Sequence, residues 1–300
     1  MGKSLADASP VAKEIFEKAD SALGMRMSDL CFEGPEEELR LTANTQPAIL
    51  ATSIAALGAF EARGGRADFV AGHSLGEYSA LIAAGSLKFE DALRLVRQRG
   101  LFMQEAVPEG EGAMAALIGC DVETVRSVCG EASESGVCSP ANINSPGQTV
   151  IAGHKSAVER AVGLAKARGA RKALMLAVSA PFHCELMRPA AERLGPVLAG
   201  VEFSDLNVPL VTNADAQVIR SGGEARDALL RQVASPVRWS ESVELLLHEG
   251  VRRFVEFGPG KVLTGLVKQM SREAQLLNEV QLLNIEDAES LEAAVAAVEM

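Results

Sequence analysis

The sequence GHSLG, residues 72–76, places Ser74 between two glycines. The apolar segment ADFVAGHS leads into it and LGEYSALIAAGS follows it, a pattern that favours a short strand and then a helix. A GxSxG sequence at a sharp strand-to-helix turn is typical of a nucleophile elbow, in which the neighbouring glycines let the backbone pass close by. The N-terminus of the following helix favours the negative charge that develops when a serine attacks a carbonyl. The alternative is a glycine-rich turn in which Ser74 only caps the helix.

A nucleophilic serine needs a base, and the chain has four histidines. His73 adjoins Ser74, so its side chain is expected to project away from the hydroxyl. His154 is expected at the start of a helix, and His248 at the end of one, where a cation suits the helix dipole. His183, in SAPFHCELM, lies between a predicted strand and a predicted helix, where open α/β sheets build their sites. We therefore predict that His183 is the base; the alternative is a loop histidine without a catalytic role.

Arg99 belongs to a predicted amphipathic helix with the sequence FEDALRLVRQRGLFMQEAV. It shares the apolar face of that helix with Ala92, Val96 and Met103, whereas the other arginines of the helix point elsewhere. A buried cation needs an anionic partner. Two interpretations stay open: an internal salt bridge to Asp or Glu, or bidentate capture of a substrate carboxylate, which suits the planar guanidinium.

The composition of the 300-residue chain limits the classes of protein that it can be. Its hydrophobic content of 48% is typical of a globular protein with one large domain, or one large and one small domain. A net charge of −11 disfavours a bulk nucleic-acid binder, which would be basic. No apolar run reaches the ~18 residues that a membrane span needs. Five cysteines without a CxxC pair indicate reduced thiols in a cytoplasmic protein, with neither a disulfide nor a zinc site.

The order of predicted elements indicates an α/β protein with a largely parallel sheet, because strands alternate with helices. Residues 110–180 depart from that alternation and give the order β-α-β-β-α-β, which is that of a ferredoxin-like unit. We therefore predict a large catalytic α/β domain, residues 1–109 and 181–300, with residues 110–180 inserted as a small domain. The glycine turn FGPGKV, residues 257–262, lacks the full GxxxxGK[ST] pattern and is not predicted to be a nucleotide-binding loop.

Five segments of the chain together resemble one known family. They are GHSLGEYSAL, VRQRGLFMQEAVPEGEGAMAALIG, NINSPGQTVIAGH, APFH and EFGPGKVLTGL. In this order they are similar to the malonyl-CoA:acyl carrier protein transacylases, acyltransferases of fatty acid and polyketide synthesis. The resemblance implies an α/β-hydrolase-like large domain with an inserted ferredoxin-like domain. It also implies a cytoplasmic, monomeric enzyme of fatty acid biosynthesis that acts on malonyl-CoA and acyl carrier protein, with no cofactor, no metal, and neither nucleic acid nor membrane as a partner.

The resemblance also implies a catalytic role for four residues. Ser74 would be the nucleophile and His183 the general base. Gln232, in LLRQVASPVRW, would orient His183 through its main-chain carbonyl, so that no Asp completes a triad. The Leu75 N–H would stabilise the oxyanion. The implied mechanism is ping-pong: Ser74 takes the malonyl group from CoA, and the phosphopantetheine thiol of the carrier protein then takes it from the serine ester.

Substrate binding would fall to three further residues. Arg99 would pair with the malonyl carboxylate, while Asn142 and Asn144 lie in the NINSPGQ loop that the family places near the cleft. A serine hydrolase such as a thioesterase remains an alternative, since the serine and the histidine fit both reactions. Arg99 separates the two functions, because a neutral ester has no carboxylate for it to bind.

Two further expectations concern the N-terminus of the chain and the surface that binds the carrier protein. Family members begin with a strand and a GQGSQ-like turn whose glutamine supplies the second oxyanion N–H, and Met1 aligns just after that turn. We therefore expect no strand before Phe69, an incomplete oxyanion hole and, as an alternative function, an inactive binding protein. Because acyl carrier protein is acidic, three basic residues of the small domain are candidates for a docking patch, the alternative being ordinary solvated charge. They are Lys155, Arg171 and Lys172.

Overall fold

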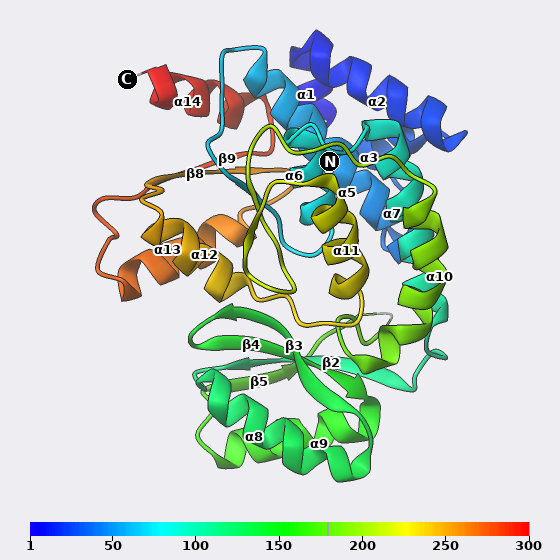
Figure 1. Cartoon of the computed structure of the whole chain (residues 1–300), viewed down its shortest axis with the longest axis vertical. Coiled ribbons are helices and arrows are strands. Elements are labelled where there is room, and N and C mark those ends of the chain that lie inside the picture. Colours follow the sequence, from blue (N-terminus) through cyan, green and yellow to red (C-terminus); the bar gives the residue numbers. More distant parts are fainter. Residues whose placement is uncertain (179, 300) are drawn as a thin grey trace.

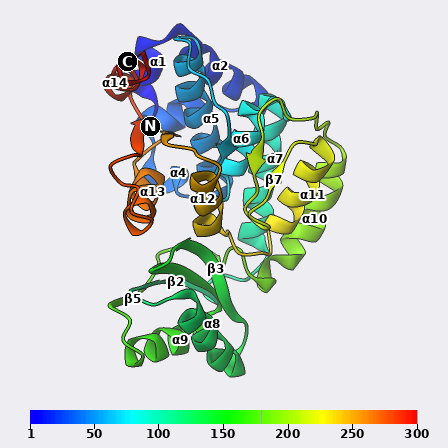
Figure 2. The same ribbon diagram turned by 60° about the vertical axis from the view of Figure 1, so that its left-hand side comes forward.

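The computed structural model of the chain describes residues 1–178 and 180–299. It is a mixed α/β structure in which most helices gather at one end and a four-stranded sheet with two helices forms the other end (Figures 1 and 2). The two termini lie on the same side of the molecule, where the amide of Ala288 donates to the hydroxyl of Ser4 across 3.1 Å. Among the described residues, no helix is long and apolar enough to cross a membrane.

Helices alone form the first part of the chain, and no strand precedes Val70, as the sequence predicts. The helix α2 begins at a Ser-Pro pair, in which the Ser9 hydroxyl accepts from the amide of Ala12, and it ends at Gly24 in the left-handed conformation. Its neighbour α5 is apolar on nearly all sides because it passes through the large core. These helices are α1 (Lys3–Ala8), α2 (Pro10–Leu23), α3 (Met27–Glu33), α4 (Glu36–Leu39) and α5 (Thr42–Glu61).

Two short sheets lie among these and later helices. The first has the order β1-β6-β7, in which β1 (Val70–Ala71) runs parallel to β6 (Leu210–Val211), and β6 pairs antiparallel with β7 (Val218–Ile219). In the second, β8 (Arg253–Phe257) runs parallel to β9 (Gln281–Ile285). The expected parallel pairs are therefore present, but β1, within the segment ADFVAGHS, and β6 have only two residues each. The sequence analysis did not predict β7 or β9.

Helices surround these sheets and connect them. The helix α11 begins with a capping box, in which the Ser221 hydroxyl accepts from the amide of Glu224 and the Glu224 carboxylate accepts from the amide of Ser221. The helices are α6 (Gly76–Ala83), α7 (Phe89–Glu105), α10 (Arg188–Ala199), α11 (Gly222–Gln232), α12 (Trp239–His248), α13 (Val262–Glu273) and α14 (Ala288–Glu299), with a 3₁₀ turn at Glu185–Met187.

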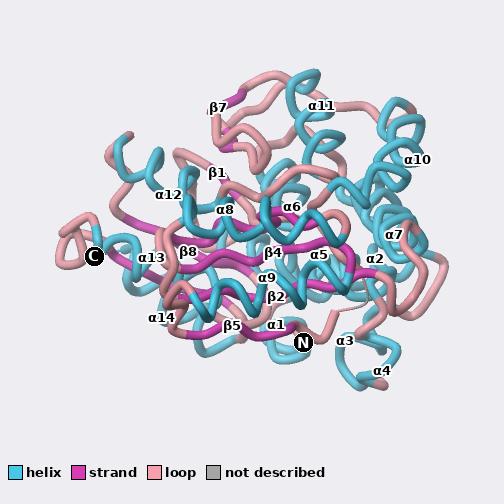
Figure 3. The backbone as a smooth tube through the Cα atoms, turned by 90° about the horizontal axis from the view of Figure 1, so that it is seen from below, coloured by secondary structure: helices cyan, strands magenta, loops and turns pink. Residues whose placement is uncertain are grey.

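The segment predicted as a small domain forms an antiparallel sheet with the order β3-β4-β2-β5. Along the chain its elements are β2 (Gly112–Ile118), α8 (Val122–Ala132), a 3₁₀ turn (Ser133–Ser135), β3 (Cys138–Ser145), β4 (Gln148–His154), α9 (Lys155–Ala167) and β5 (Lys172–Met175). The two helices run across one face of this sheet and bury an apolar core separate from the large one (Figure 3). A further apolar cluster, around Trp239 and Leu266, lies among α12 and α13.

The strand β3 connects the two parts. Its Ile143 amide donates to the Val237 carbonyl across 2.9 Å, and the Val237 amide donates to the Ala141 carbonyl across 2.8 Å. Val237 lies two residues before the start of α12, so these bonds fix the edge of the small sheet against the larger part of the molecule. All five cysteines are free and buried.

Candidate active site

Ser74 lies in the turn between β1 and α6, in a strained backbone conformation. Its φ of 52° is in the left-handed region, which few residues other than glycine adopt without cost. A Cβ at Gly72 would lie 2.0 Å from the carbonyl carbon and oxygen of Gly76, so only glycine fits there. A Cβ at Gly76 would meet nothing within 4 Å. The close approach of the backbone expected from both glycines therefore depends on the missing side chain of Gly72 alone.

Asn213 fixes this turn from the neighbouring strand. Its Oδ1 accepts from the Ser74 amide across 2.6 Å, and its Nδ2 donates to the Gly72 carbonyl across 2.7 Å. Asn213 follows β6, and the parallel pairing of β6 with β1 brings it beside the turn. The sequence analysis missed this residue. Its only signal was a polar residue at the end of a predicted strand.

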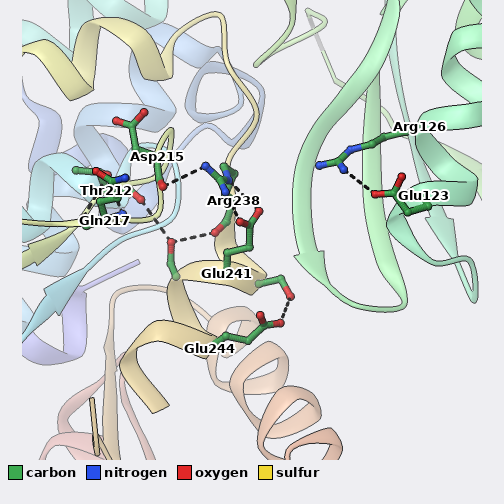
Figure 4. A network of polar contacts seen from close by, with 10 residues as sticks. Glu123, Arg126, Thr212, Asp215, Gln217, Arg238, Glu241 and Glu244 are labelled. Carbon is green, nitrogen blue, oxygen red and sulfur yellow. Dashed lines mark hydrogen bonds and ion pairs between the residues drawn. The ribbon is translucent and has the colours of Figure 1, made fainter. Parts of the chain in front are cut away.

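A polar network fixes the loop that carries Asn213 (Figure 4). The Arg238 amide donates to the Asn213 carbonyl across 2.9 Å. The Arg238 side chain donates to the Asp215 carbonyl across 3.1 Å and to the Glu241 carboxylate on α12 across 2.8 Å. On the same helix, the Ser242 hydroxyl contacts the Thr212 carbonyl at 3.4 Å. The position of Asn213 is therefore set by α12 as well as by the sheet.

The imidazole of His183 links Ser74 to Gln232. The Ser74 Oγ lies 2.7 Å from Nε2 of His183, and Nδ1 of His183 lies 2.9 Å from the main-chain oxygen of Gln232. Because a carbonyl oxygen only accepts, Nδ1 carries the proton and Nε2 presents its lone pair to the serine. Burial, and next the positive charge of Arg99, lower the pKa of His183 to about 3. The imidazole is therefore neutral near pH 7 and able to accept the serine proton.

Arg99 is 2% exposed and lies in direct contact with the nucleophile. Its Nη2 donates to the Ser74 Oγ across 3.1 Å and to Oε1 of Gln232 across 2.9 Å, while its Nη1 donates to Oε1 of Gln46 across 2.7 Å. Within the described part of the chain it forms no ion pair, and its Nε has no hydrogen-bond partner. The internal salt bridge that the sequence left open is thus absent from the described residues. A buried cation with unused donors beside a serine is suited to an anionic acyl group.

Two residues that the sequence analysis missed support this arrangement. Gln46 is a buried amide in α5, and its signal was a polar residue within an otherwise apolar helix. Glu77 is 1% exposed in the first turn of α6, where its signal was a carboxylate one turn after the candidate nucleophile. Its Oε2 accepts from Nε2 of Gln232 across 2.7 Å and from the Asn213 amide across 3.1 Å.

The two asparagines of the NINSPGQ segment lie beside this cluster. Oδ1 of Asn144 is 2.9 Å from Nε2 of His73, whose ring centroid lies 5.7 Å from that of Trp239. The His73 ring is therefore engaged away from the Ser74 hydroxyl, as expected. Asn142 forms a β-bridge with Val237. Neither asparagine hydrogen-bonds to Ser74, Arg99 or His183 among the described residues.

The remaining candidates lie as follows. The Leu75 N–H directly follows the nucleophile and makes no hydrogen bond to any residue that the structure describes, so it is an available donor for an oxyanion. His154 immediately precedes α9, and its Nδ1 accepts from the Val137 amide. His248 ends α12. Both histidines are thus at helix ends, as expected from the sequence.

Comparison with known families and structures agrees with this chemistry. A family model described as an acyl transferase domain matches residues 1–295. The malonyl CoA-acyl carrier protein transacylase of Bacillus subtilis is 49% identical over 98% of this chain and 92% of the relative. The protein of the same name from Escherichia coli K12 is 52% identical over 90% of this chain and 88% of the relative.

Solved structures give the same result. A malonyl-transacylase in complex with a type II polyketide synthase acyl-carrier protein is 48% identical, with a TM-score of 0.94 over 99% of this chain and 94% of the other. The malonyl CoA-acyl carrier protein transacylase of Coxiella burnetii is 41% identical, with a TM-score of 0.94 over 99% and 92%. None of these relatives is described as a thioesterase or as a binding protein without activity, so the two alternative functions gain no support.

Proposed function

This chain belongs to the acyl transferase domain family, and we propose that it moves a malonyl group from malonyl-CoA to the phosphopantetheine thiol of an acyl carrier protein. It is an acyl-carrier-protein S-malonyltransferase of fatty acid biosynthesis, and the reaction passes through an ester on Ser74. The observation that carries this proposal is the guanidinium of Arg99, buried, without a carboxylate partner among the described residues, and 3.1 Å from the Ser74 hydroxyl. Of the common short acyl groups, those that carry a free carboxylate besides the thioester carbonyl suit this guanidinium.

The first half of the reaction acylates the enzyme. The Ser74 Oγ attacks the thioester carbonyl while Nε2 of His183 takes the serine proton, over the 2.7 Å that separates them. The Leu75 N–H donates to the oxyanion, and Arg99 binds the distal carboxylate. When the tetrahedral intermediate collapses, the carbon–sulfur bond breaks and the CoA sulfur takes the proton from His183. The product is a malonyl ester on Ser74.

The second half reverses the roles. The phosphopantetheine thiol gives its proton to His183 and attacks the ester carbonyl, the carbon–oxygen bond breaks, and the Ser74 oxygen recovers the proton. The main-chain carbonyl of Gln232 keeps the His183 ring in one tautomer throughout, a role that its 2.9 Å contact with Nδ1 supports. In both halves the acyl carboxylate stays on Arg99. This mechanism needs no cofactor, because the CoA thioester is itself the substrate.

Asn142 and Asn144 act at the border of the substrate site. Asn144 contacts His73, the residue before the nucleophile, and Asn142 bridges to Val237. Through these contacts the small domain is placed against the elbow. The asparagines therefore shape the entrance for the pantetheine arm without contacting Ser74.

We further propose that the chain has two domains. Residues 1–109 and 181–300 form an α/β-hydrolase-like catalytic domain, and residues 110–180 form an inserted ferredoxin-like domain. The order β3-β4-β2-β5, with α8 and α9 on one face, supports the second assignment. Five free, buried cysteines suit a monomeric enzyme of the cytoplasm, where thiols stay reduced.

A basic groove between the two domains is the proposed docking site for the carrier. It has a volume of about 410 Å³, and Arg171 of the small domain faces Lys268 and Arg272 of α13 across it. Lys155 lines a different pocket, beside Glu111 and Glu159. Of the basic residues considered from the sequence, Arg171 thus has the surroundings that an acidic partner needs, while Lys155 does not.

Intact-protein mass spectrometry after incubation with malonyl-CoA tests the proposed function. We expect a single malonyl adduct that maps to Ser74, that is absent from S74A, and that disappears when phosphopantetheinylated carrier protein is added. A folded protein that gains no adduct would contradict the transferase assignment. An adduct lost to water as fast in the absence of the carrier as in its presence would indicate a hydrolase instead.

A further inference from the structure

Among the side chains that the structure describes, one carboxyl group and one guanidinium are buried. They are Glu77, 1% exposed in α6, and Arg99, 2% exposed in α7. They do not form an ion pair. The amide of Gln232 lies between them instead: Arg99 donates to its Oε1 across 2.9 Å, and its Nε2 donates to Glu77 across 2.7 Å.

Glu77 and the main-chain carbonyl of Ser74 together determine which way this amide points, since both accept from Nε2 of Gln232, across 2.7 Å and 2.9 Å. An ionised carboxylate accepts hydrogen bonds and cannot donate them, so the NH₂ group of Gln232 must face Glu77 and its oxygen must face Arg99. The reversed amide would place two donors against each other at Arg99 and two acceptors against each other at Glu77. The Asn213 amide, 3.1 Å from Oε2, keeps the carboxylate itself in place.

The separation of Glu77 from Arg99 also balances the charge of the guanidinium without occupying its donors. A buried guanidinium needs a compensating negative charge, but a carboxylate in direct contact with it would occupy the donors that the substrate requires. Here the compensating charge lies one amide away, at the N-terminus of α6, which favours an anion. Nε of Arg99 consequently has no protein partner among the described residues and remains available.

We propose that Glu77 is a positioning residue for the choice of acyl group: through the Gln232 amide it fixes the Arg99 guanidinium in the orientation that receives the malonyl carboxylate. This inference rests on the proposed malonyl transfer and deepens it. Glu77 contacts neither the thioester carbon nor the imidazole of His183, so its effect falls on malonyl relative to an acyl group without the second carboxylate.

The ionisation of Glu77 offers an independent readout. Burial raises the pKa of Glu77 to about 7, against hydrogen bonds from Gln232 and Asn213 and the charge of Arg99, which favour the carboxylate. Asp215, in the loop after β6, is the like charge that faces it, and Tyr78 is its neighbour on α6. A protonated Glu77 can donate as well as accept and no longer requires the NH₂ group of Gln232 to face it, so selectivity for malonyl should fall as the pH falls through this range.

The test measures single-turnover acylation of Ser74 by malonyl-CoA and by acetyl-CoA in the 300-residue chain. We expect E77Q to lower the malonyl rate about tenfold relative to the acetyl rate, and the remaining ratio to be independent of pH. E77D, which keeps the charge, should recover part of the ratio. The matched control is E256Q: the Glu256 carboxylate also accepts from two amides at the start of a helix, Leu263 and Thr264, but touches none of the site residues. Its ratio should equal that of the unmodified protein.

Equal slowing of both acyl groups in E77Q, or no slowing of either, would overturn the inference. If E77Q does not fold, E77D and the unmodified protein at about pH 6 and about pH 9 decide the question, and an unchanged ratio in both again overturns it. Failure of the proposed function and failure of the role of Glu77 give different results. An unmodified protein that malonyl-CoA never acylates removes the proposed function, whereas normal acylation with an unaltered ratio in E77Q removes only the role of Glu77.

Discussion

The guanidinium of Arg99 donates to the hydroxyl oxygen of Ser74 across 3.1 Å, so the group proposed to bind the acyl carboxylate touches the nucleophile itself. In a malonyl group a single methylene separates the carboxylate from the carbonyl that the serine attacks. A cation far from the serine would not reach both ends of so short a group. The contact between Arg99 and Ser74 therefore matches the length of the acyl chain as well as its charge.

Removing the guanidinium of Arg99 should slow acylation by charged acyl groups and leave acylation by neutral acyl groups almost unchanged. In R99A we expect the rate of malonyl acylation to fall by a factor of about 10² or more, which corresponds to the loss of one partner of a buried charge pair. Acetyl-CoA should react at close to the original rate, since it has no carboxylate to bind. Single-turnover mass spectrometry with each thioester measures both rates. R94A is the control, because Arg94 lies on the same helix but pairs with Asp91 at the surface.

Lengthening the acyl group should be nearly as damaging. Succinyl-CoA keeps the second carboxylate but adds a methylene, which displaces it by about 1.5 Å when the thioester is held over Ser74. Since a misplacement of about 1 Å can cost ~10²-fold in rate, we expect succinyl acylation to be slower than malonyl acylation by that order. Comparable rates for the two dicarboxylic thioesters in the same single-turnover assay would show that the position of Arg99 does not select for the length of the acyl group.

The two glycines of the elbow should respond differently to alanine. G72A places a Cβ 2.0 Å from the backbone of Gly76, so the turn must open, and we expect loss of Ser74 acylation together with a lower unfolding temperature. G76A meets nothing within 4 Å and replaces glycine in the first turn of α6, where alanine is favoured by up to about 1 kcal/mol. Thermal unfolding and acylation of the two variants check this. Equal damage from both would mean that the turn depends on Gly76 in another way.

Much of this site could be predicted from the sequence. The residues that were missed were missed for a common reason. Ser74 and His183 were found because each follows a recognisable strand, and Arg99 because helical spacing places it among apolar residues. Asn213 was missed, although it bonds to both sides of the elbow, because its partner Ser74 lies 139 positions away in the chain. No local pattern reports such a contact.

In the fold, too, pairing between strands close in the sequence could be predicted, and the extent of pairing between remote strands could not. The order of helices and strands within residues 110–180 was predicted correctly, since each of these strands pairs with others inside the same segment. The extent of β1 and β6, two residues each, could not be read from the sequence. Their pairing partner is remote, and where the ladder ends is decided by the loops that carry Ser74 and Asn213, which local propensity does not record.

Two buried groups should give opposite responses of stability to pH. The pKa of His183 is lowered from 6.5 to about 3, so its contribution is fully present above pH 6.5 and is lost as the pH falls through 3. The pKa of Glu77 is raised from 4.5 to about 7, so its contribution is fully present below pH 4.5 and is lost as the pH rises through 7. Between these limits, acidification destabilises through His183 and stabilises through Glu77.

Replacing either side chain should reveal the pH response of stability that the other one causes. In E77Q, acidification from about pH 6.5 to about pH 5 should cost about 2 kcal/mol of unfolding free energy, and more than in the unmodified protein, while H183Q should become more stable over the same range. Urea unfolding followed by fluorescence provides the measurement, because Trp239 is the only tryptophan. Identical pH responses of the three proteins would show that neither group carries the linkage.

Charge reversal at the basic groove should weaken transfer to the carrier. Arg171 and Arg272 line the groove from opposite sides, and Glu273, the one acidic residue among the described residues that line it, already accepts from Gln269 across 3.0 Å. In R171E and R272E we therefore expect a higher KM for the carrier, by about tenfold, and a weaker dependence of the rate on salt, since fewer charge pairs are screened.

The measurement is the second half-reaction, in which malonyl-enzyme prepared in advance is mixed with phosphopantetheinylated carrier at low and high ionic strength. Starting from the ester removes any effect of the substitutions on CoA binding. K155E makes the same change of charge on the same domain, but at a pocket that already holds Glu111 and Glu159, so it should transfer at the unmodified rate. If R171E and R272E transfer as fast as K155E, the carrier docks elsewhere. If all three are slowed alike, the carrier responds to the net charge of the enzyme and not to this groove.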